Sequence, residues 1–303
     1  MKNLTLKQLR YFEALADQAH FGRAADVTAI SQPALSVQIR ELETQLGGPL
    51  FERGGRSVTL TALGEALRPR IRAVLQSVDD LGDAARGAGG GLRGRLRLGI
   101  IPTIAPYLLP RLMGQLARGW PDLAIDIRET VTSALLRELS EGRIDCAIVA
   151  LPIGEPAFTE VPLFSEPFVL VRPEADADRP MPGRDELREM RLLLLDEGHC
   201  FRDQALSFCD LDRAHTALGL DATSLSTLVQ MVGAGMGVTL IPEMAVEVET
   251  RAAPVSVGRF NEPQPARTVG MIWRKTTPLA GALEEMAGDL FQQKWMRFVE
   301  TGR

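Results

Sequence analysis

Cysteine and histidine are both scarce in this chain, which has three of each among 303 residues. So few cysteines cannot build the disulfide framework of a small secreted domain, and cytosolic disulfides are usually transient, catalytic or sensing. The histidines are scattered at His20, His199 and His215 and no Cys-x-x-Cys occurs, so the spacing of a zinc site is missing. We expect no metal and no cofactor.

Long apolar runs are missing as well. No stretch reaches the roughly 18 apolar residues that a membrane-spanning helix needs. Residues 1–8 also lack the apolar core and the cleavage site of a secretory signal. We therefore expect a cytoplasmic protein without a membrane partner. With 45% hydrophobic and 24% charged residues the composition is ordinary for globular domains, and 303 residues allow two or more of them.

The charge is unevenly distributed along the chain. The net charge is −5, yet residues 1–72 carry ten lysines and arginines against seven acidic residues. A mildly basic end on an otherwise acidic chain is compatible with nucleic-acid binding at that end.

The basic end has the pattern of a helix-turn-helix. Apolar residues recur at helical spacing from Leu6 to about Leu46. Ser31 can cap a helix whose first turn tolerates Pro33. This helix has one apolar face, formed by Leu35, Ile39, Leu42 and Leu46. Its other face offers polar side chains suited to base edges in the major groove of double-stranded DNA, from Gln32, Ser36 and Arg40.

A wing and a long helix follow. Two short strands, Leu50–Arg53 and Val58–Thr61, flank a turn that contains glycine, and Arg53 and Arg56 are available for DNA phosphates. In the next helix apolar residues alternate steps of four and three, at Leu67, Ile71, Val74, Val78, Leu81 and Ala85. This coiled-coil period favours a dimerisation helix, which Pro69 should bend.

The rest of the chain alternates strand and helix patterns. Strand patterns at residues 96–101, 124–128 and 144–149 are separated by helical ones, which predicts a parallel sheet with helices on both faces. A helix is expected to begin at Pro102-Thr103. Similar alternation recurs up to residue 242, so we expect an α/β domain of two lobes with a cleft between them. Thr103 and Thr132 each follow a strand, at the edge where such sheets bind ligands.

These patterns divide the chain into three parts. Residues 1–60 are predicted to form the winged helix-turn-helix domain, and residues 61–91 the dimerisation helix and hinge. Residues 92–303 are predicted to form the two-lobed regulatory domain, with lobe I at about 92–165 and 268–303 and lobe II at about 166–267.

Two of the three cysteines lie close together in the sequence. Cys200 directly follows His199 and precedes Arg202 and Asp203, and cationic neighbours favour the nucleophilic thiolate. Cys209 is compatible both with inward packing and with a second thiol that traps an oxidised Cys200. If residues 203–209 are helical and the preceding loop is compact, the two sulfurs are expected to begin far apart. Nine residues of helix span roughly 13.5 Å, whereas a disulfide needs Cα atoms about 4.4–6.8 Å apart. The mid-strand position of Cys146 indicates a buried structural residue.

The N-terminal pattern resembles a known family. It rests on short motifs: Ala24-Ala25, Ser31-Gln32-Pro33-Ala34-Leu35-Ser36, Ile39-x-x-Leu42-Glu43, Leu46-Gly47, Leu50-Phe51-x-Arg53 and Leu60-Thr61-x-x-Gly64. Residues 4–86 thereby resemble the winged helix-turn-helix and linker helix of the LysR family of bacterial transcriptional regulators. The C-terminal part resembles the effector domain of that family, which is similar to periplasmic binding proteins. By position, Gln32, Pro33 and Ser36 would approach bases and Arg53 the backbone. Val37 stands where many relatives have arginine.

Residues 198–209 resemble the signature of the hydrogen-peroxide-sensing branch of this family. The resemblance implies that peroxide oxidises Cys200, the peroxidatic cysteine, and that the resolving Cys209 then forms a disulfide with it. It also implies a peroxide pocket of five residues, Thr103, Thr132, His199, Asp203 and Arg267. The expected protein is a homodimer or homotetramer on promoter DNA that activates oxidative-stress genes through RNA polymerase and is reduced by a glutaredoxin or thioredoxin.

Three other interpretations remain open. A LysR regulator could respond to a small metabolite in the cleft, with incidental cysteines. A thiol peroxidase could be fused to a DNA-binding arm, although the chain has no Cys-x-x-Cys to receive electrons, and we expect no enzyme. A solute-binding protein fits least. Without the family, His199 would be interpreted as a satisfied turn histidine and Arg267 as a surface arginine.

Overall fold

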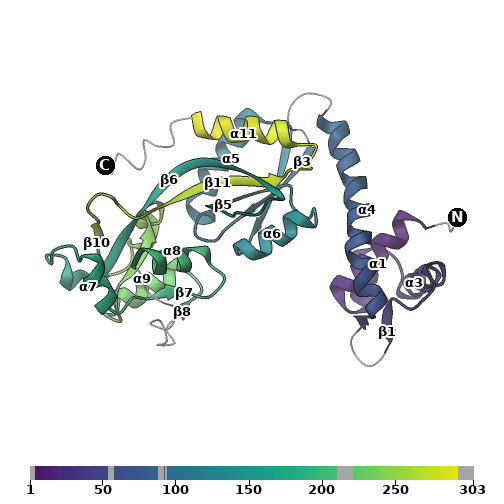
Figure 1. The fold of residues 1–303 in the computed structure, drawn as a ribbon, viewed down its shortest axis with the longest axis horizontal. Coiled ribbons are helices and arrows are strands. Elements are labelled where there is room, and N and C mark those ends of the chain that lie inside the picture. The colour runs from purple at the N-terminus through teal and green to yellow at the C-terminus, as the bar shows by residue number, and fades with distance from the viewer. Residues whose placement is uncertain (1–3, 54–57, 88–91, 93, 210–220, 293–303) are drawn as a thin grey trace. The chain divides into compact units, whose positions relative to one another are not determined.

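The computed structural model describes residues 4–53, 58–87, 92, 94–209 and 221–292. Figure 1 shows the fold, in which the chain divides into two compact units at Ala85 and Arg86. Within the described residues, no helix has the length and apolar character needed to span a membrane.

The N-terminal unit is a winged helix-turn-helix, as predicted. Its elements are α1 (Leu6–Gln18), α2 (Phe21–Val27), α3 (Gln32–Leu46), the antiparallel strands β1 (Phe51–Arg53) and β2 (Val58–Leu60), and α4 (Ala62–Gly87). Ser31 caps α3 by accepting a hydrogen bond from the Ala34 amide at 3.3 Å. Gly47 ends the helix at φ 88°, a left-handed conformation that favours glycine. Three of the four residues predicted for the apolar face are fully buried, whereas Leu46 is only half-buried.

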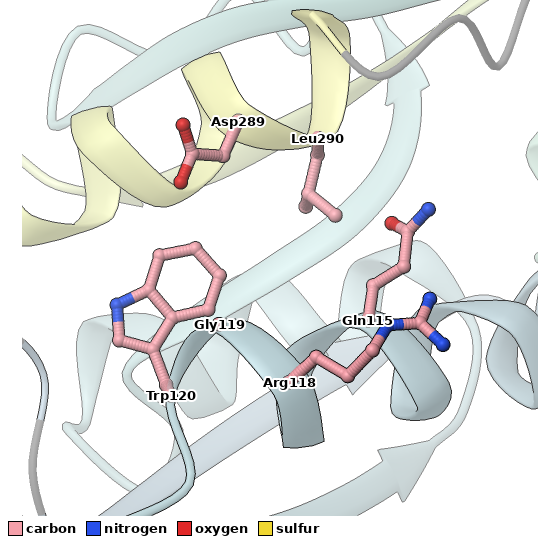
Figure 2. A pocket seen from close by; sticks show the side chains of 6 residues that line it. All are labelled: Gln115, Arg118, Gly119, Trp120, Asp289 and Leu290. Atoms are coloured by element: carbon pink, nitrogen blue, oxygen red, sulfur yellow. The ribbon is translucent and has the colours of Figure 1, made fainter.

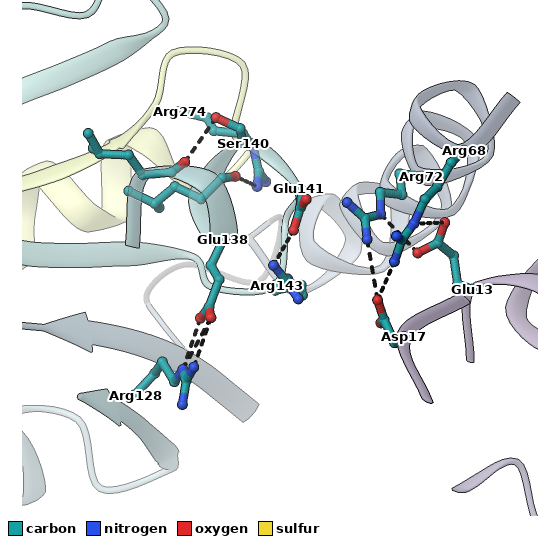
Figure 3. Close-up of polar contacts among 12 residues, drawn as sticks. Glu13, Asp17, Arg68, Arg72, Arg128, Glu138, Ser140, Glu141, Arg143 and Arg274 are labelled. Atoms are coloured by element: carbon teal, nitrogen blue, oxygen red, sulfur yellow. Dashed lines mark hydrogen bonds and ion pairs between the residues drawn. The ribbon is translucent and has the colours of Figure 1, made fainter. Parts of the chain in front are cut away.

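The long helix α4 is attached to α1 by ion pairs. Arg72 Nε lies 2.8 Å from Glu13 Oε2, and Arg68 pairs with Asp17 (Figure 3). Burial raises the pKa of Glu13, and the adjacent Arg72 opposes this rise. The helix continues through Pro69 and leaves Leu81 74% exposed on its surface. An apolar side chain with this exposure suits the predicted contact with a second α4.

The C-terminal unit contains a seven-stranded sheet. Strands β3 (Gly94–Ile100), β4 (Leu123–Glu129) and β5 (Cys146–Leu151) are parallel, and α5 (Ala105–Gly119) and α6 (Thr132–Ser140) connect them. Strands β6 (Phe158–Pro173) and β11 (Ala266–Arg274) add to this group in antiparallel orientation. The three strands from which a parallel sheet was predicted are thus parallel to one another. Beyond them the sheet continues with antiparallel pairs, because β5, β11 and β6 are neighbours that no helical crossover joins as parallel strands.

Strand β6 connects two lobes of this unit (Figure 1). Its first part, up to Pro167, pairs with β11, and its last part pairs with β9 (Thr239–Pro242) and β10 (Val255–Arg259). The second lobe also contains α7 (Arg184–Glu189), β7 (Leu194–Leu195), α8 (Cys200–Cys209), β8 (Asp221–Ala222), α9 (Leu225–Gly233) and α10 (Val246–Glu249). The last described helix, α11 (Ala280–Gln292), packs on the core of the first lobe.

Each lobe has its own hydrophobic core. The first includes Ile100, Leu135 and Trp273, and the second includes Phe168, Phe201 and Cys209. Two elements begin at residues other than those expected. Helix α5 starts at Ala105 rather than at Pro102-Thr103, and α8 starts at Cys200 rather than at residue 203. Both shifts affect the candidate site, because Thr103 lies in the turn before α5 and both thiols lie on α8.

Candidate functional site

Two threonines occupy equivalent places at the carboxyl ends of adjacent strands. In the register of β3 and β4, Ile100 lies opposite Glu129, and Thr103 and Thr132 each follow three residues later. Helix α6, which begins at Thr132, is fixed to β4 by Arg128, whose Nη2 lies 3.0 Å from Glu138 Oε1 (Figure 3). The Thr132 hydroxyl oxygen is buried and has no hydrogen-bond partner among the described residues. Because an unpaired buried hydroxyl is costly, this oxygen suits a bound polar molecule.

Arg267 of β11 is buried in the interior and is not a surface arginine. Its Nε donates to Glu166 Oε2 at 2.7 Å, its Nη1 to Thr103 Oγ1 at 2.8 Å, and its Nη2 to the Thr103 carbonyl at 2.9 Å. Nη2 also lies 2.7 Å from Glu166 Oε2, so these contacts engage four of the five N–H donors and leave one, on Nη1, for another acceptor. Since the Thr103 hydroxyl accepts from Arg267, its own proton remains to be donated. The pair can therefore hold an oxygen atom with two donors.

Glu166 of β6 is a site residue that the sequence reasoning missed. Its side chain is 1% exposed, and it also accepts a 3.2 Å hydrogen bond from the Met244 amide. Burial raises the pKa of Glu166, while the charge of Arg267 opposes that rise. The available signal was an acidic residue between two aromatic ones, Phe164 and Phe168, because a carboxylate buried beside them needs a partner.

The two predicted redox thiols lie at opposite ends of one helix. Cys200 is the first residue of α8 and Cys209 the last, and both are free thiols. Nine helical steps separate their Cα atoms by roughly 13.5 Å and turn through about 900°, which places the side chains on opposite faces. Cys200 is half-buried against the core of the first lobe, whereas Cys209 is fully buried in that of the second. A disulfide between them requires α8 to open.

Phe201 joins the thiol helix to the buried arginine. The Arg267 guanidinium lies 5.7 Å from the centre of the Phe201 ring, a cation–π distance. Phe201 in turn packs edge-on against Phe168, with ring centres 5.0 Å apart. Phe201, the residue next to Cys200, thereby contacts Arg267, so a change in the conformation of α8 would alter the surroundings of the Thr103–Arg267 pair.

The other residues predicted for the pocket are not joined directly to Arg267. Among the described residues, Thr132, His199 and Asp203 make no hydrogen bond with it. His199 is half-buried immediately before α8, and Asp203 lies in the first turn of α8 with an exposed side chain. Cys146 is buried in β5, and burial raises its pKa well above the ordinary range, as expected of a structural cysteine.

We expect His199 to titrate below the ordinary histidine value of 6.5. Burial lowers the pKa of His199, and Asp196 opposes this effect. The unfolded chain therefore binds the proton more readily, so the contribution to stability is present above pH 6.5 and is lost as the pH falls below it. Proton–nitrogen NMR of histidine-labelled protein will measure the midpoint, with His199→Gln used for assignment. A midpoint at or above 6.5 would contradict the prediction.

The proposed DNA-reading residues gather at the start of α3. Ser31, Gln32 and Pro33 are exposed, and Ser36 is half-buried. Arg40 is exposed, and its Nε donates to the Ser36 carbonyl at 3.2 Å. Arg53 ends β1, but its side chain and Arg56 lie outside the part of the chain that the structure describes.

A pocket of about 220 Å³ lies between the end of α5 and α11 (Figure 2). Side chains of both signs border it, since Arg118 comes from α5 and Asp289 from α11. None of the predicted site residues lines this pocket, which is formed by Gln115, Arg118, Gly119, Trp120, Asp289 and Leu290.

Comparisons with known proteins agree with this architecture. A family model described as a bacterial regulatory helix-turn-helix protein of the lysR family matches residues 6–65, and the LysR substrate binding domain matches residues 89–293. A winged helix-turn-helix joined to a two-lobed α/β domain defines a DNA-binding transcriptional regulator. The chain belongs to the LysR family.

Two curated relatives and two solved structures illustrate the similarity. A probable hydrogen peroxide-inducible genes activator of Streptomyces viridosporus is 43% identical over 94% of this chain and 93% of its own length. The DNA-binding transcriptional dual regulator OxyR of Escherichia coli is 41% identical over 94% of both chains. A full-length OxyR variant from Pseudomonas aeruginosa has a TM-score of 0.75 at 37% identity, covering 96% of this chain and 98% of its own. A hydrogen peroxide-bound OxyR mutant from Corynebacterium glutamicum has a TM-score of 0.66 at 37% identity, covering 96% and 93%.

Proposed function

We propose that this protein is a transcriptional regulator that senses hydrogen peroxide through a reversible Cys200–Cys209 disulfide. The observation that carries the proposal is the placement of two free thiols at opposite ends and faces of α8. Because the thiols cannot meet while α8 is helical, oxidation and a change of shape are obligatorily coupled. The relatives named as hydrogen peroxide-inducible activators support the same conclusion.

The chemistry proceeds in two balanced steps. The sulfur of Cys200 attacks one peroxide oxygen, the O–O bond breaks, and Cys200 becomes a sulfenic acid while the second oxygen leaves as water with the thiol proton. The Cys209 thiol then attacks the Cys200 sulfur, and a disulfide and a second water form. Two thiols thus supply the two electrons that reduce one peroxide. Reduction back to the dithiol consumes two thiols of a glutaredoxin or a thioredoxin.

The polar residues receive roles in the first step. We assign Thr103, Thr132, His199, Asp203 and Arg267 to the peroxide pocket. The free proton of the Thr103 hydroxyl and the remaining donor of Arg267 would stabilise the oxygen that accumulates charge as the O–O bond breaks. The unpartnered Thr132 oxygen would accept a hydrogen bond from peroxide.

The DNA-binding end follows the winged-helix pattern. Gln32, Pro33 and Ser36 approach bases, Arg40 and Arg53 face the DNA, and Ser31 holds the start of α3. The exposed apolar residues of α4 pair two chains, and two such dimers form a homotetramer on promoter DNA. Oxidation then alters the DNA contacts and favours activation through RNA polymerase.

The protein acts in the cytoplasm, where the promoter DNA is. It is not an enzyme, because each oxidation persists until a reductant reverses it. The proposed parts are residues 1–60 for DNA binding, 61–91 for dimerisation and hinge, and 92–303 for sensing. In the last part, residues 92–165 and 268–303 are assigned to lobe I and residues 166–267 to lobe II, of which 93, 210–220 and 293–303 lie outside the residues that the structure describes.

Mass spectrometry before and after one equivalent of hydrogen peroxide tests the proposal. Non-reducing peptide maps are expected to gain a single cross-link, Cys200–Cys209, and a DNA footprint recorded in parallel is expected to change. Absence of the cross-link would reject the mechanism. A footprint insensitive to peroxide, together with a thermal shift on adding a metabolite, would favour a regulator that binds a small molecule. Continuous peroxide turnover with a reductant would favour a thiol peroxidase.

A further inference from the structure

The helix that carries both thiols is held at its C-terminal end by an arginine from another helix. Arg188, in the last turn of α7, donates from Nε to the carbonyl of Cys209 at 3.1 Å. The last carbonyls of a helix have no amide partner within it, so a donor from outside stabilises that end. The positive charge is also favourable beside the negative end of the helix dipole. Asp185 lies 3.4 Å from Arg188 Nη1 on the same helix.

The N-terminal half of α8 has a comparable attachment. Arg202 donates from Nη1 to the carbonyl of Leu195, at the end of β7, over 2.7 Å in the interior. The helix is thus bound to neighbouring backbone or side chains of the second lobe near both ends. Arg202 belongs to α8 itself and is buried, so replacing it would disturb the core. Arg188 belongs to α7, and its side chain is 38% exposed, so it can be changed without leaving a buried charge.

We propose that Arg188 is a positioning residue that stabilises the helical, dithiol form of α8 and thereby sets how readily Cys200 and Cys209 join. This inference rests on the proposed function. Formation of the disulfide requires the helix between the two thiols to unwind. The hydrogen bond from Arg188 to the Cys209 carbonyl instead stabilises the intact helix. Arg188 would act through its hydrogen bond to the Cys209 carbonyl, so its effect belongs to the second step, in which the Cys209 thiol displaces water from the Cys200 sulfenic acid.

The two oxidation steps should respond differently to the loss of Arg188. Attack on peroxide takes place at Cys200, at the far end of α8, and should keep its rate. Disulfide formation should become faster and more favourable, because the dithiol helix loses a stabilising contact that the opened segment does not need. A charged hydrogen bond with partial solvent exposure supports a threefold to tenfold change, as an order-of-magnitude estimate.

The experiment compares the full-length chain with Arg188→Ala, Arg188→Lys and the control Arg191→Ala. Arg191 is exposed and its side chain makes no hydrogen bond or ion pair among the described residues, so Arg191→Ala removes the same charge from the same region without breaking such a bond. Each protein is equilibrated in dithiothreitol redox buffers, and the fraction of Cys200–Cys209 disulfide is measured by mass spectrometry. Arg188→Ala should shift the equilibrium constant toward the disulfide by about threefold to tenfold, where tenfold equals about 30 mV for two electrons. Arg188→Lys should recover part of the shift, since lysine can still donate.

A kinetic measurement separates the steps. In a Cys209→Ser background, where the sulfenic acid accumulates, a sulfenic-acid probe should report the same peroxide rate with and without Arg188. An unchanged equilibrium in Arg188→Ala, or an equal shift in Arg191→Ala, would overturn the role of Arg188. Failure of the unsubstituted chain to form any Cys200–Cys209 disulfide would instead overturn the proposed function, so the two failures are distinguishable.

Discussion

Replacement of Cys200 by serine is expected to abolish both disulfide formation and the response to peroxide. A serine hydroxyl cannot be oxidised to a sulfenic acid, so Cys209 has nothing to attack. The loss should be complete rather than partial, because Cys146 is buried in the first lobe and cannot substitute. The measurement uses a reporter gene driven by a promoter that the protein regulates, in cells that lack the native gene. With Cys200→Ser, its expression will stay at the uninduced level both before and after addition of peroxide.

The matched control is Cys146→Ala, which removes the third thiol of the chain from a wholly buried site. Burial raises the pKa of Cys146 well above its ordinary range, and this disfavours the nucleophilic thiolate. Induction should therefore be retained in this variant. Persistent induction in Cys200→Ser, or its loss in Cys146→Ala while the protein remains folded, would contradict the assignment of the sensing thiol. Cys209→Ser should accumulate sulfenic acid without the cross-link.

The sequence predicts the N-terminal unit well because its signals are local. The cap at Ser31, the apolar face of α3 and the glycine at its end are each determined by residues within one or two turns. The two thiols are foreseeable for the same reason, since nine helical steps fix their separation once the segment is helical. The earlier start of α8 at Cys200 strengthens that argument.

Contacts between residues distant in sequence could not be predicted in the same way. The first half of β6 could not be predicted, because Pro162, Pro167 and the polar residues Thr159, Glu160 and Ser165 interrupt its apolar pattern. The partners Thr103, Glu166 and Arg267 come from three different segments, and only the sheet brings them together. Helix α5 begins after Thr103 because the hydroxyl and the carbonyl of that residue are both bound by Arg267.

Arg267→Met is expected to cost about 3–5 kcal/mol of stability, since removing one partner of a buried ion pair leaves an uncompensated charge. The side chains of Arg267 and Glu166 are 0% and 1% exposed, so water cannot replace the arginine. The Thr103 hydroxyl would also lose its donor. Urea unfolding followed by circular dichroism measures the loss, with cooperative transitions required in each variant.

The loss of stability in Arg267→Met should become larger as the pH rises. Burial already raises the pKa of Glu166, and removal of Arg267 takes away the charge that opposes this rise. Below the ordinary carboxyl value of 4.5 the group is protonated in both the folded and the unfolded chain, so the penalty is small. As the pH rises toward the higher pKa of the folded variant, only the unfolded chain releases its proton, and stability falls. The penalty of Arg267→Met should therefore be larger near pH 8 than near about pH 5.

A second substitution identifies the carboxylate as the cause. In Arg267→Met combined with Glu166→Gln no buried charge remains, so a large part of the stability should return and its excess pH dependence should disappear. Glu166→Gln alone leaves Arg267 without its anion and should be destabilising in its own right. If the double variant is no more stable than Arg267→Met, the cost arises from lost packing beside Phe201 rather than from the unpaired charge of Glu166.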